Sequence, residues 1–285
     1  MTFSIVANVG DAYGVAVASR FLAASGPVAM VRPGVGAVAS QALANAGYRV
    51  AALDRLEEGR TADEALTAIT GEDSQTSTRQ VGIVGSASQV TFTGADCVPW
   101  CGGVAGRDAD GGYAIQGNIL TGEEVITSME RTWLEGAHLP FVDRLVETLL
   151  AGDRAGGDRR GRQSAGVYAT YPGAGYDACG VLADLRVDDH PQPVQELHRL
   201  VALNELHFGR PTKVLPLEGP LLEDVRERLE RLGYAGDVPT ALDAWGAMEN
   251  LEMRLTPDGI DARVLQVLRE QTLPPEQTSE RFPTF

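Results

Sequence analysis

Residues 2–20 read Thr-Phe-Ser-Ile-Val-Ala-Asn-Val-Gly-Asp-Ala-Tyr-Gly-Val-Ala-Val-Ala-Ser-Arg, and they predict how the fold begins. Residues 3–9 are rich in apolar and β-branched side chains, and residues 15–19 are small and apolar. The composition of residues 10–14 between them is typical of a turn. We therefore predict a β-hairpin at the start of the chain, where ends more commonly fray.

Beyond this hairpin, strand patterns and helix patterns come in separate runs. A second hairpin is expected at 79–84 and 90–93, followed by a loop at 94–112 that is rich in Gly and Asp. Thr61-Ala62-Asp63-Glu64 is a capping box at the start of a helix. Segregated runs of this kind are typical of an α+β fold, with antiparallel sheet and helix in separate layers. The other strands are expected at 113–116, 164–170 and 180–187, and the helices at 38–46, 51–58, 61–69, 123–134 and 139–151.

The composition changes after about residue 190, where two prolines precede a series of helix patterns. Helices are expected at 194–206, 221–232, 240–255 and 261–271, and residues 274–285 are expected to be irregular. The pattern predicts two domains, one at residues 1–208 and a small helical module at residues 209–285.

Composition and charge exclude several functional classes. The formal net charge is −15, which repels polyanions, so nucleic-acid binding is not expected. The sequence has no apolar run of membrane-spanning length and no signal-peptide pattern, so we expect a cytoplasmic protein without membrane contact. The three cysteines are expected to be free thiols. We find no converging set of metal ligands and no nucleotide-binding loop, so no metal or cofactor is expected.

Thr2 is the first candidate for chemistry. A small second residue favours removal of Met1, which would leave Thr2 with a free α-amine beside its own hydroxyl. An α-amine has a pKa of about 7.7 to 8.0, which suits a general base at neutral pH. A threonine hydroxyl activated by such an amine is a known nucleophile. The alternative is an ordinary terminal residue.

The segment Gly14 to Arg20 returns antiparallel beside Thr2 and ends in a Ser-Arg pair, which resembles the first hairpin of proteasome β-type subunits. Residues 34–41 resemble the glycine-containing turn of those subunits, which implies that the backbone at Gly36 and Ala37 forms an oxyanion hole. Residues 159–166 resemble the segment whose serine supports the N-terminal amine, and Ser164 matches that serine.

A closer resemblance is to the DUF1028 family, which has an N-terminal-nucleophile (Ntn) hydrolase-like fold. It covers about residues 1–200 and implies an αββα sandwich followed by the helical module. The tail resembles a peptidoglycan-binding domain through residues 231–234, 241–242, 245 and 249–252. The stretches that carry the DUF1028 resemblance are 2–7, 14–22, 34–41, 92–97, 116–118 and 156–164.

The active-site lysine of the proteasome subunits has no counterpart in this chain. Its single lysine, Lys213, lies outside the resembling domain. Arg32, Arg20 or Arg162 is then the candidate source of positive charge. An arginine stays charged and does not share a proton as a lysine can, so proteolysis of the proteasome kind is not expected.

Four further residues are candidates for the site. Asn118 either donates to an oxyanion or serves as a turn residue beside Gly117. Asp158 and Arg162 either orient the amine or a substrate carboxylate, or form a surface ion pair. Gln41 either lines the pocket or makes hydrogen bonds along a helix face.

These observations predict an amidohydrolase that cleaves the C–N bond of a small-molecule amide, with Thr2 as nucleophile and Arg32, Gln41, Asp158 and Arg162 binding substrate. The alternative is a non-catalytic protein that binds a small molecule or another protein and retains the fold. We expect a homo-oligomer, and we favour a packing or oligomerisation role for the tail over cell-wall contact.

Overall fold

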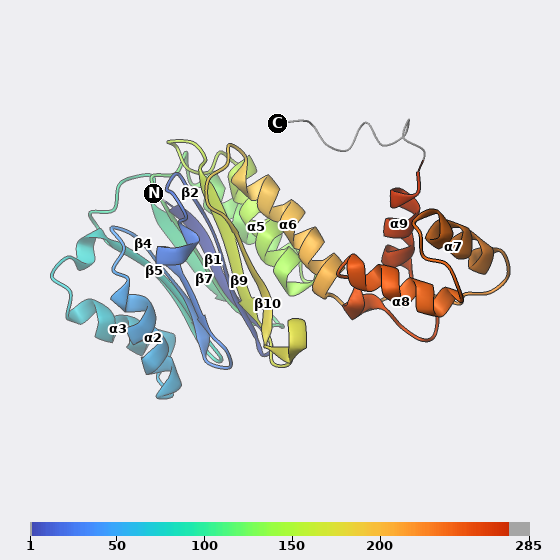
Figure 1. Cartoon of the computed structure of the whole chain (residues 1–285). Coiled ribbons are helices and arrows are strands. Elements are labelled where there is room, and N and C mark those ends of the chain that lie inside the picture. Colours follow the sequence, from blue (N-terminus) through green and yellow to red (C-terminus); the bar gives the residue numbers. More distant parts are fainter. Residues whose placement is uncertain (1, 274–285) are drawn as a thin grey trace. The chain divides into compact units, whose positions relative to one another are not determined.

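The computed structural model describes residues 2–273 (Figure 1). The chain divides into two compact units, with the boundary between Ala202 and Leu203. The first unit combines helices with two antiparallel sheets, and the second is mainly helical. The predicted α+β class is therefore confirmed.

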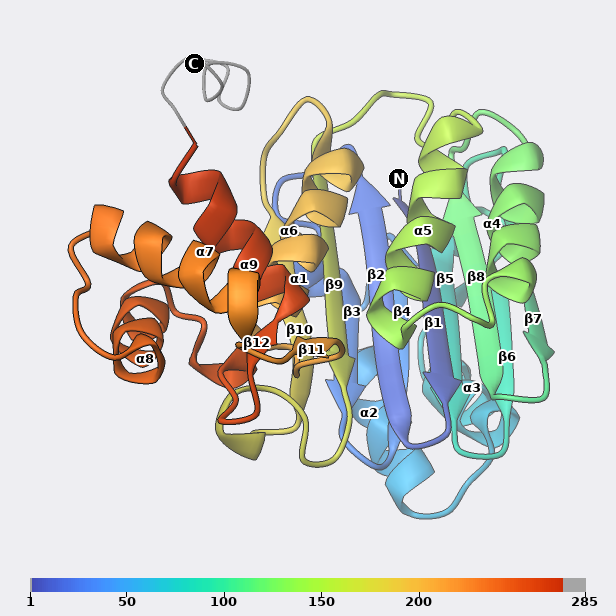
Figure 2. The same cartoon turned by 90° about the vertical axis from the view of Figure 1, so that its right-hand side faces the viewer.

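The larger sheet contains the hairpin that the first residues predict. Phe3 of β1 (Thr2–Val9) pairs with Ala18 of β2 (Ala12–Ser19), and the two strands are antiparallel. This hairpin lies in the middle of the sheet, whose strand order is β10-β9-β2-β1-β8-β7 (Figure 2). The other strands are β7 (Gly102–Arg107), β8 (Gly112–Asn118), β9 (Ser164–Thr170) and β10 (Val181–Val187).

The smaller sheet shows that one predicted helix is wrong. Residues 38–46, which we expected to be helical, fall mostly in β4 (Gly36–Ala42), the second strand of the sheet order β3-β4-β5-β6. The side chains of β4 alternate, because Ala37 and Ala39 pack toward the larger sheet and Val38 packs toward helices. Small residues suit a strand pressed between two layers, so tertiary packing overrides the helix propensity of alanine. The other strands are β3 (Ala29–Arg32), β5 (Arg79–Gly85) and β6 (Gln89–Thr93), and β5 and β6 form the predicted second hairpin.

Helices cover the outer face of each sheet. The capping box predicted at Thr61 is present, with the Thr61 side chain and Glu64 bonded to each other's backbone N–H. In Figure 2, α4 and α5 lie in front of the larger sheet, and Phe3 and Ile5 pack beneath them. Val6 faces the smaller sheet, so alternate residues of β1 serve two cores. The helices are α1 (Ser25–Val28), α2 (Gly47–Glu57), α3 (Ala62–Gly71), α4 (Glu124–Glu135), α5 (Phe141–Arg154) and α6 (Pro193–Phe208).

The predicted loop at 94–112 is also partly wrong, because it contains β7. This strand lies at the edge of the larger sheet and pairs with β8. Its glycines permit close approach: a Cβ on Gly103 would overlap the Ile115 carbonyl oxygen, and one on Gly102 would overlap the Trp100 ring. Low β-propensity therefore does not exclude a strand where neighbours leave no room for side chains.

The second unit packs three helices and a two-stranded ribbon around Trp245 and its aliphatic neighbours. The helix predicted at 240–255 is too long, since α8 ends at Met248 and a separate 3-10 turn follows at Glu252–Arg254. The prediction for residues 274–285 lies outside the described residues. The elements are α7 (Gly219–Arg231), α8 (Val238–Met248), α9 (Ala262–Gln271), β11 (Val214–Leu215) and β12 (Ile260–Asp261).

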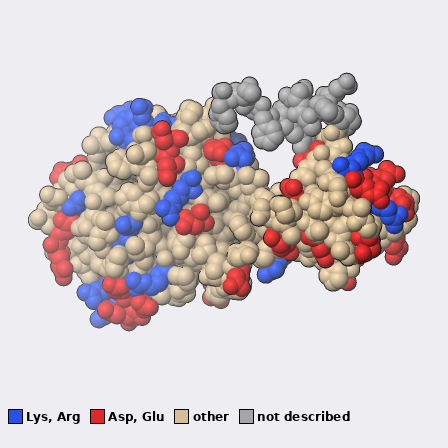
Figure 3. Space-filling model, in the orientation of Figure 1, with Lys and Arg blue, Asp and Glu red and all other residues tan. Residues whose placement is uncertain are grey.

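The surface in Figure 3 shows arginine side chains beside acidic ones rather than one broad basic area. Many of these neighbours are ion pairs, such as Arg199 with Glu196. Within residues 2–273, every helix is too short or too polar to cross a bilayer.

Candidate functional site

Thr2 begins β1 and lies beside the end of β2. It pairs with Asn118 of β8 and is only 5% exposed. Its Oγ1 donates to the Oγ of Ser19, the last residue of β2, at 3.2 Å. Ser19 is itself buried, so the hairpin brings two hydroxyl groups together at one protected point.

A cavity of about 330 Å³ opens next to Thr2. Its polar lining includes Gln41, Gln75 and Arg79, and its apolar lining comes mainly from residues 21–28 and 42–44. Phe21 is 58% exposed and Leu43 is 63% exposed, so the lining includes large apolar side chains open to solvent. A ligand that carries an apolar group would fit this cavity better than a highly charged one.

A network of buried side-chain amides holds the backbone of Thr2 in place. The Gln41 amide donates to the Thr2 carbonyl oxygen at 3.2 Å and to Gln80 Oε1 at 2.8 Å. The Asn118 amide donates to the same Gln80 oxygen at 2.8 Å and lies 3.5 Å from the Thr2 carbonyl. Asn118 is thus a buried strand residue rather than a turn residue, and its donors already have partners.

Between the two sheets, the same network continues from Gln41 to Ser4, Gln116 and Thr91. Ser4 donates to Gln41 Oε1 at 2.7 Å and accepts from Gln116 Nε2 at 2.7 Å. Thr91 donates to Gln116 Oε1 at 3.2 Å. Buried polar groups of this kind are costly unless each is paired, so the network fixes one arrangement of the strands.

Gly82→Ala is expected to destabilise this network. A Cβ at Gly82 would overlap the side-chain amide of Gln116, which would then lose its bonds to Ser4 and Thr91. We expect a loss of about 1 to 3 kcal/mol in the free energy of unfolding. Chemical denaturation measures it, and Gly71→Ala, where a Cβ meets no atom within 4 Å, is the control. Equal stability of the two variants would contradict the assignment.

Arg79 lines the cavity and forms a salt bridge with Asp73. Its Nε donates to Asp73 Oδ2 at 2.8 Å and its Nη1 donates to the Leu43 carbonyl. Asp73 also accepts from Tyr48 Oη at 2.9 Å and from the Gln75 N–H at 2.8 Å. The Arg79 guanidinium and these donors hold the pKa of the Asp73 carboxyl well below its usual range. Arg79 and Asp73 thereby fix the loop that lines the cavity.

The depressed pKa of Asp73 predicts how the protein responds to acid. A carboxyl whose folded pKa is lowered stabilises the fold above its unfolded pKa of about 4, and the benefit is lost as pH falls below that value. Asp73→Asn should therefore lower the melting temperature at pH 7, and the difference from wild type should shrink between pH 4 and pH 2.5. A difference that stays constant over that range would contradict the pairing.

Ser164 and Asp158 fix the segment that follows β2. Ser164 Oγ donates to the Phe21 carbonyl at 2.6 Å and accepts from the Ala24 N–H at 3.0 Å. Asp158 Oδ2 accepts from the Arg20 N–H at 2.7 Å. Both residues therefore position the segment that carries Phe21 into the cavity.

Arg162 lies in the same region and pairs with a buried carboxylate, Asp153, at 2.7 Å. A narrow cleft of about 40 Å³ is lined by Ser19, Asp158, Arg162 and Ser164, among others. Of the predicted residues, Thr2 and Gln41 thus line the larger cavity, whereas Asp158, Arg162 and Ser164 line the cleft.

Gly36, Ala37 and Arg32 do not join this group. Gln41, near the C-terminal end of β4, contacts Thr2, whereas Gly36 lies five residues away, or about 16 Å along an extended strand. Arg32 pairs with Asp54 at 2.8 Å and Glu57 at 2.7 Å. The structure therefore does not bring these three residues to Thr2, because Arg32 ends β3 and Gly36 and Ala37 begin β4.

Ser19, Gln80 and Arg79 belong to the site but were not among the predicted residues. Gln80 is a polar residue inside an otherwise apolar strand, a signal that could have identified it. Ser19 could have been identified as the serine at the end of the predicted return strand. Nothing in the sequence marks Arg79, since its role depends on a salt bridge between the first residue of β5 and Asp73 in the preceding loop.

Comparison with known protein families finds a match to each part of the chain. A model described as "Family of unknown function (DUF1028)" matches residues 2–197. A model described as "Putative peptidoglycan binding domain" matches residues 206–268. The crystal structure of a protein from Silicibacter pomeroyi, assigned to the DUF1028 model, is similar in fold, with a TM-score of 0.62 and 24% identity over 90% of this chain and 96% of that one. No curated protein matches.

Proposed function

The chain belongs to the DUF1028 family, and from this premise we propose that it is an N-terminal-nucleophile amidohydrolase that cleaves the C–N bond of a small amide. The observation that carries the proposal is the buried hydroxyl pair of Thr2 and Ser19 beside a cavity of about 330 Å³. The stacked sheets between outer helix layers support an αββα sandwich of the Ntn-hydrolase type (Figure 1).

The proposed reaction requires that residue 1, which lies outside the described residues, is removed. The Thr2 hydroxyl attacks the amide carbonyl carbon, and the freed α-amine accepts the hydroxyl proton. The tetrahedral intermediate collapses as the C–N bond breaks, and the leaving amine takes that proton. Water then hydrolyses the Thr2 ester, the acid is released, and the hydroxyl is restored. Ser19 positions the Thr2 hydroxyl through their 3.2 Å hydrogen bond.

The oxyanion requires a donor other than Gly36 or Ala37. Residues 42–44 line the cavity, and the Leu43 N–H already donates to the Thr78 carbonyl. We therefore place the donor at the Ala44 N–H. Arg79 holds this loop through the Leu43 carbonyl and keeps the donor in place.

Thr2 is a better candidate for the nucleophile than Cys97 or Cys101. Burial raises the pKa of the Cys97 and Cys101 thiols, which keeps them protonated at neutral pH. A protonated thiol is a poor nucleophile. The Cys97 thiol is also committed to the Arg79 carbonyl.

The test combines the N-terminal sequence of the purified protein with a panel of amides. We expect a chain that begins at Thr2 and that hydrolyses amides of apolar acyl groups faster than those of charged acyl groups. A chain that begins at Thr2 but hydrolyses none of the panel would favour the alternative, a small-molecule or protein-binding role for the same cavity.

A second proposal concerns residues 209–285. We propose that they form a module of their own that contacts a cell-wall polymer, and the match over residues 206–268 supports this. This proposal replaces the packing or oligomerisation role that the sequence favoured, and it requires a location outside the cytoplasm. The homo-oligomer expected from the sequence stays a prediction. Pelleting of the full chain with purified peptidoglycan tests the contact, and a chain that stays in solution would count against it.

A further inference from the structure

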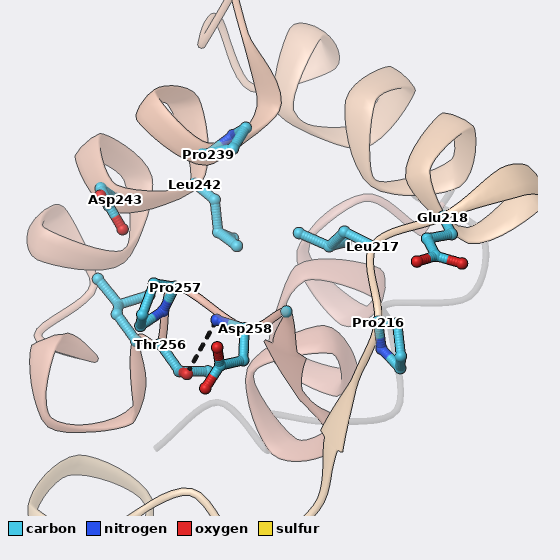
Figure 4. A pocket seen from close by; sticks show the side chains of 11 residues that line it. Pro216, Leu217, Glu218, Pro239, Leu242, Asp243, Thr256, Pro257 and Asp258 are labelled. Carbon is cyan, nitrogen blue, oxygen red and sulfur yellow. Dashed lines mark hydrogen bonds between the residues drawn. The ribbon is translucent and has the colours of Figure 1, made fainter.

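The second unit contains a pocket of about 560 Å³ (Figure 4). Three leucines line it, Leu217, Leu242 and Leu255, which we call the leucine floor. Leu217 and Leu242 point toward each other from opposite sides of the pocket (Figure 4). This volume falls within the range of small-ligand sites and could hold two or three amino-acid residues.

The charged side chains that line the pocket are all acidic. Glu218, Asp243 and Asp258, which we call the carboxylate rim, belong to the lining, and no lysine, arginine or histidine of the described residues does. The rim carboxylates make no ion pair within residues 2–273, whereas Asp224 in the same unit pairs with two arginines. The rim therefore presents uncompensated negative charge around an apolar surface.

Three prolines stiffen the walls. Pro216, Pro239 and Pro257 line the pocket, and each has a fixed φ and no N–H group. The segment at the Pro257 side is held further by the Asp258 N–H, which donates to Thr256 Oγ1 at 3.3 Å (Figure 4). A pocket with stiff walls loses little conformational entropy when a ligand binds.

We propose that this pocket binds a short amine-bearing peptide branch of a cell-wall polymer. An aliphatic side chain of the branch lies on the leucine floor, and its ammonium group pairs with the carboxylate rim. Charge complementarity selects a cationic ligand, and the apolar floor selects an aliphatic one. The assignment to a cell-wall polymer rests on the proposed contact of this unit, whereas the ligand chemistry follows from the pocket alone.

The test uses calorimetric titration of the full chain carrying Thr2→Ala, so that hydrolysis does not enter the result. The probe is leucyl-alanyl-lysinamide, and the comparison ligand is N-acetyl-leucyl-alanyl-glutamate. We expect saturable binding of the probe and none of the comparison ligand. Failure of the probe to bind would overturn the proposal and would leave the proposed amidohydrolase reaction untouched.

A matched pair of variants locates the binding. Asp243→Asn combined with Asp258→Asn should weaken probe binding about tenfold, the expected loss of two exposed charge pairs. Glu230→Gln combined with Glu252→Gln removes the same charge from exposed positions outside the pocket and should leave binding unchanged. Equal affinities for the two double variants would overturn the proposal.

Pelleting with purified peptidoglycan tests the source of the peptide. The rim variant should pellet less than the control variant. If both pellet equally, the cell-wall assignment of this pocket is wrong, even where the probe binds.

Discussion

Thr2→Ala is expected to lower amide hydrolysis by at least about 10³-fold, because it removes the nucleophile and leaves only binding and the oxyanion donor. Thr2 is buried and bonded to Ser19, so its hydroxyl has a fixed position rather than a mobile one. Initial rates on the best amide of the panel measure the effect. Alanine is small, so removal of residue 1 should proceed in the variant as in wild type.

Thr2→Ser is the matched control. It retains the hydroxyl and the α-amine, and it should keep turnover within about tenfold of wild type. Circular dichroism of both variants tests whether the strand still forms. Turnover in Thr2→Ala equal to that of wild type would exclude Thr2 as the nucleophile.

Arg254→Ala is expected to cost about 3 to 5 kcal/mol, the largest stability effect that we predict. Arg254 is fully buried and pairs with Asp261 at 3.4 Å and with Glu205 at 2.6 Å. It also donates to the carbonyl oxygens of Leu206 and Arg210. Its loss would leave Asp261 buried without its cation.

Chemical denaturation followed by tryptophan fluorescence measures the loss, and the buried Trp245 of the second unit contributes to the signal beside Trp100 and Trp133 of the first. A total stability of 5 to 15 kcal/mol is typical of a domain, so this unit should melt at far lower denaturant concentration. Arg231→Ala is the control, since Arg231 and its partner Glu227 are both exposed, and it should change stability by less than about 0.5 kcal/mol. Similar losses in the two variants would contradict the role of Arg254.

Local pattern was enough to predict much of the fold. The hairpin at residues 2–20 and the capping box at Thr61 depend on neighbouring residues alone, and both are present. The strand at 36–42 was mistaken for a helix because its alanines face a second sheet that no local pattern reveals. The strand at 102–107 was missed because its glycines fit against neighbours distant in sequence.

The candidate site could likewise be predicted only in part from the sequence. Thr2 was identified from the chemistry of a threonine that follows Met1, and Ser164 by resemblance, and both lie beside Ser19. Gly36 and Ala37 were assigned as an oxyanion hole on the assumption that a helix follows their turn. Since β4 follows instead, we propose that the donor belongs to residues 42–44, which line the cavity and were not predicted. Contacts such as Arg79 with the Leu43 carbonyl depend on chain reversals that spacing alone does not specify.

Covalent capture of Thr2 tests the central claim most directly. The full chain would be incubated with a β-lactone that carries an apolar side chain, and the adduct would be located by intact mass and peptide mapping. We predict one acyl group on the Thr2 hydroxyl of a chain that begins at Thr2, and no adduct in Thr2→Ala. A chain that keeps residue 1, or an acyl group on another residue that persists in Thr2→Ala, would contradict the account.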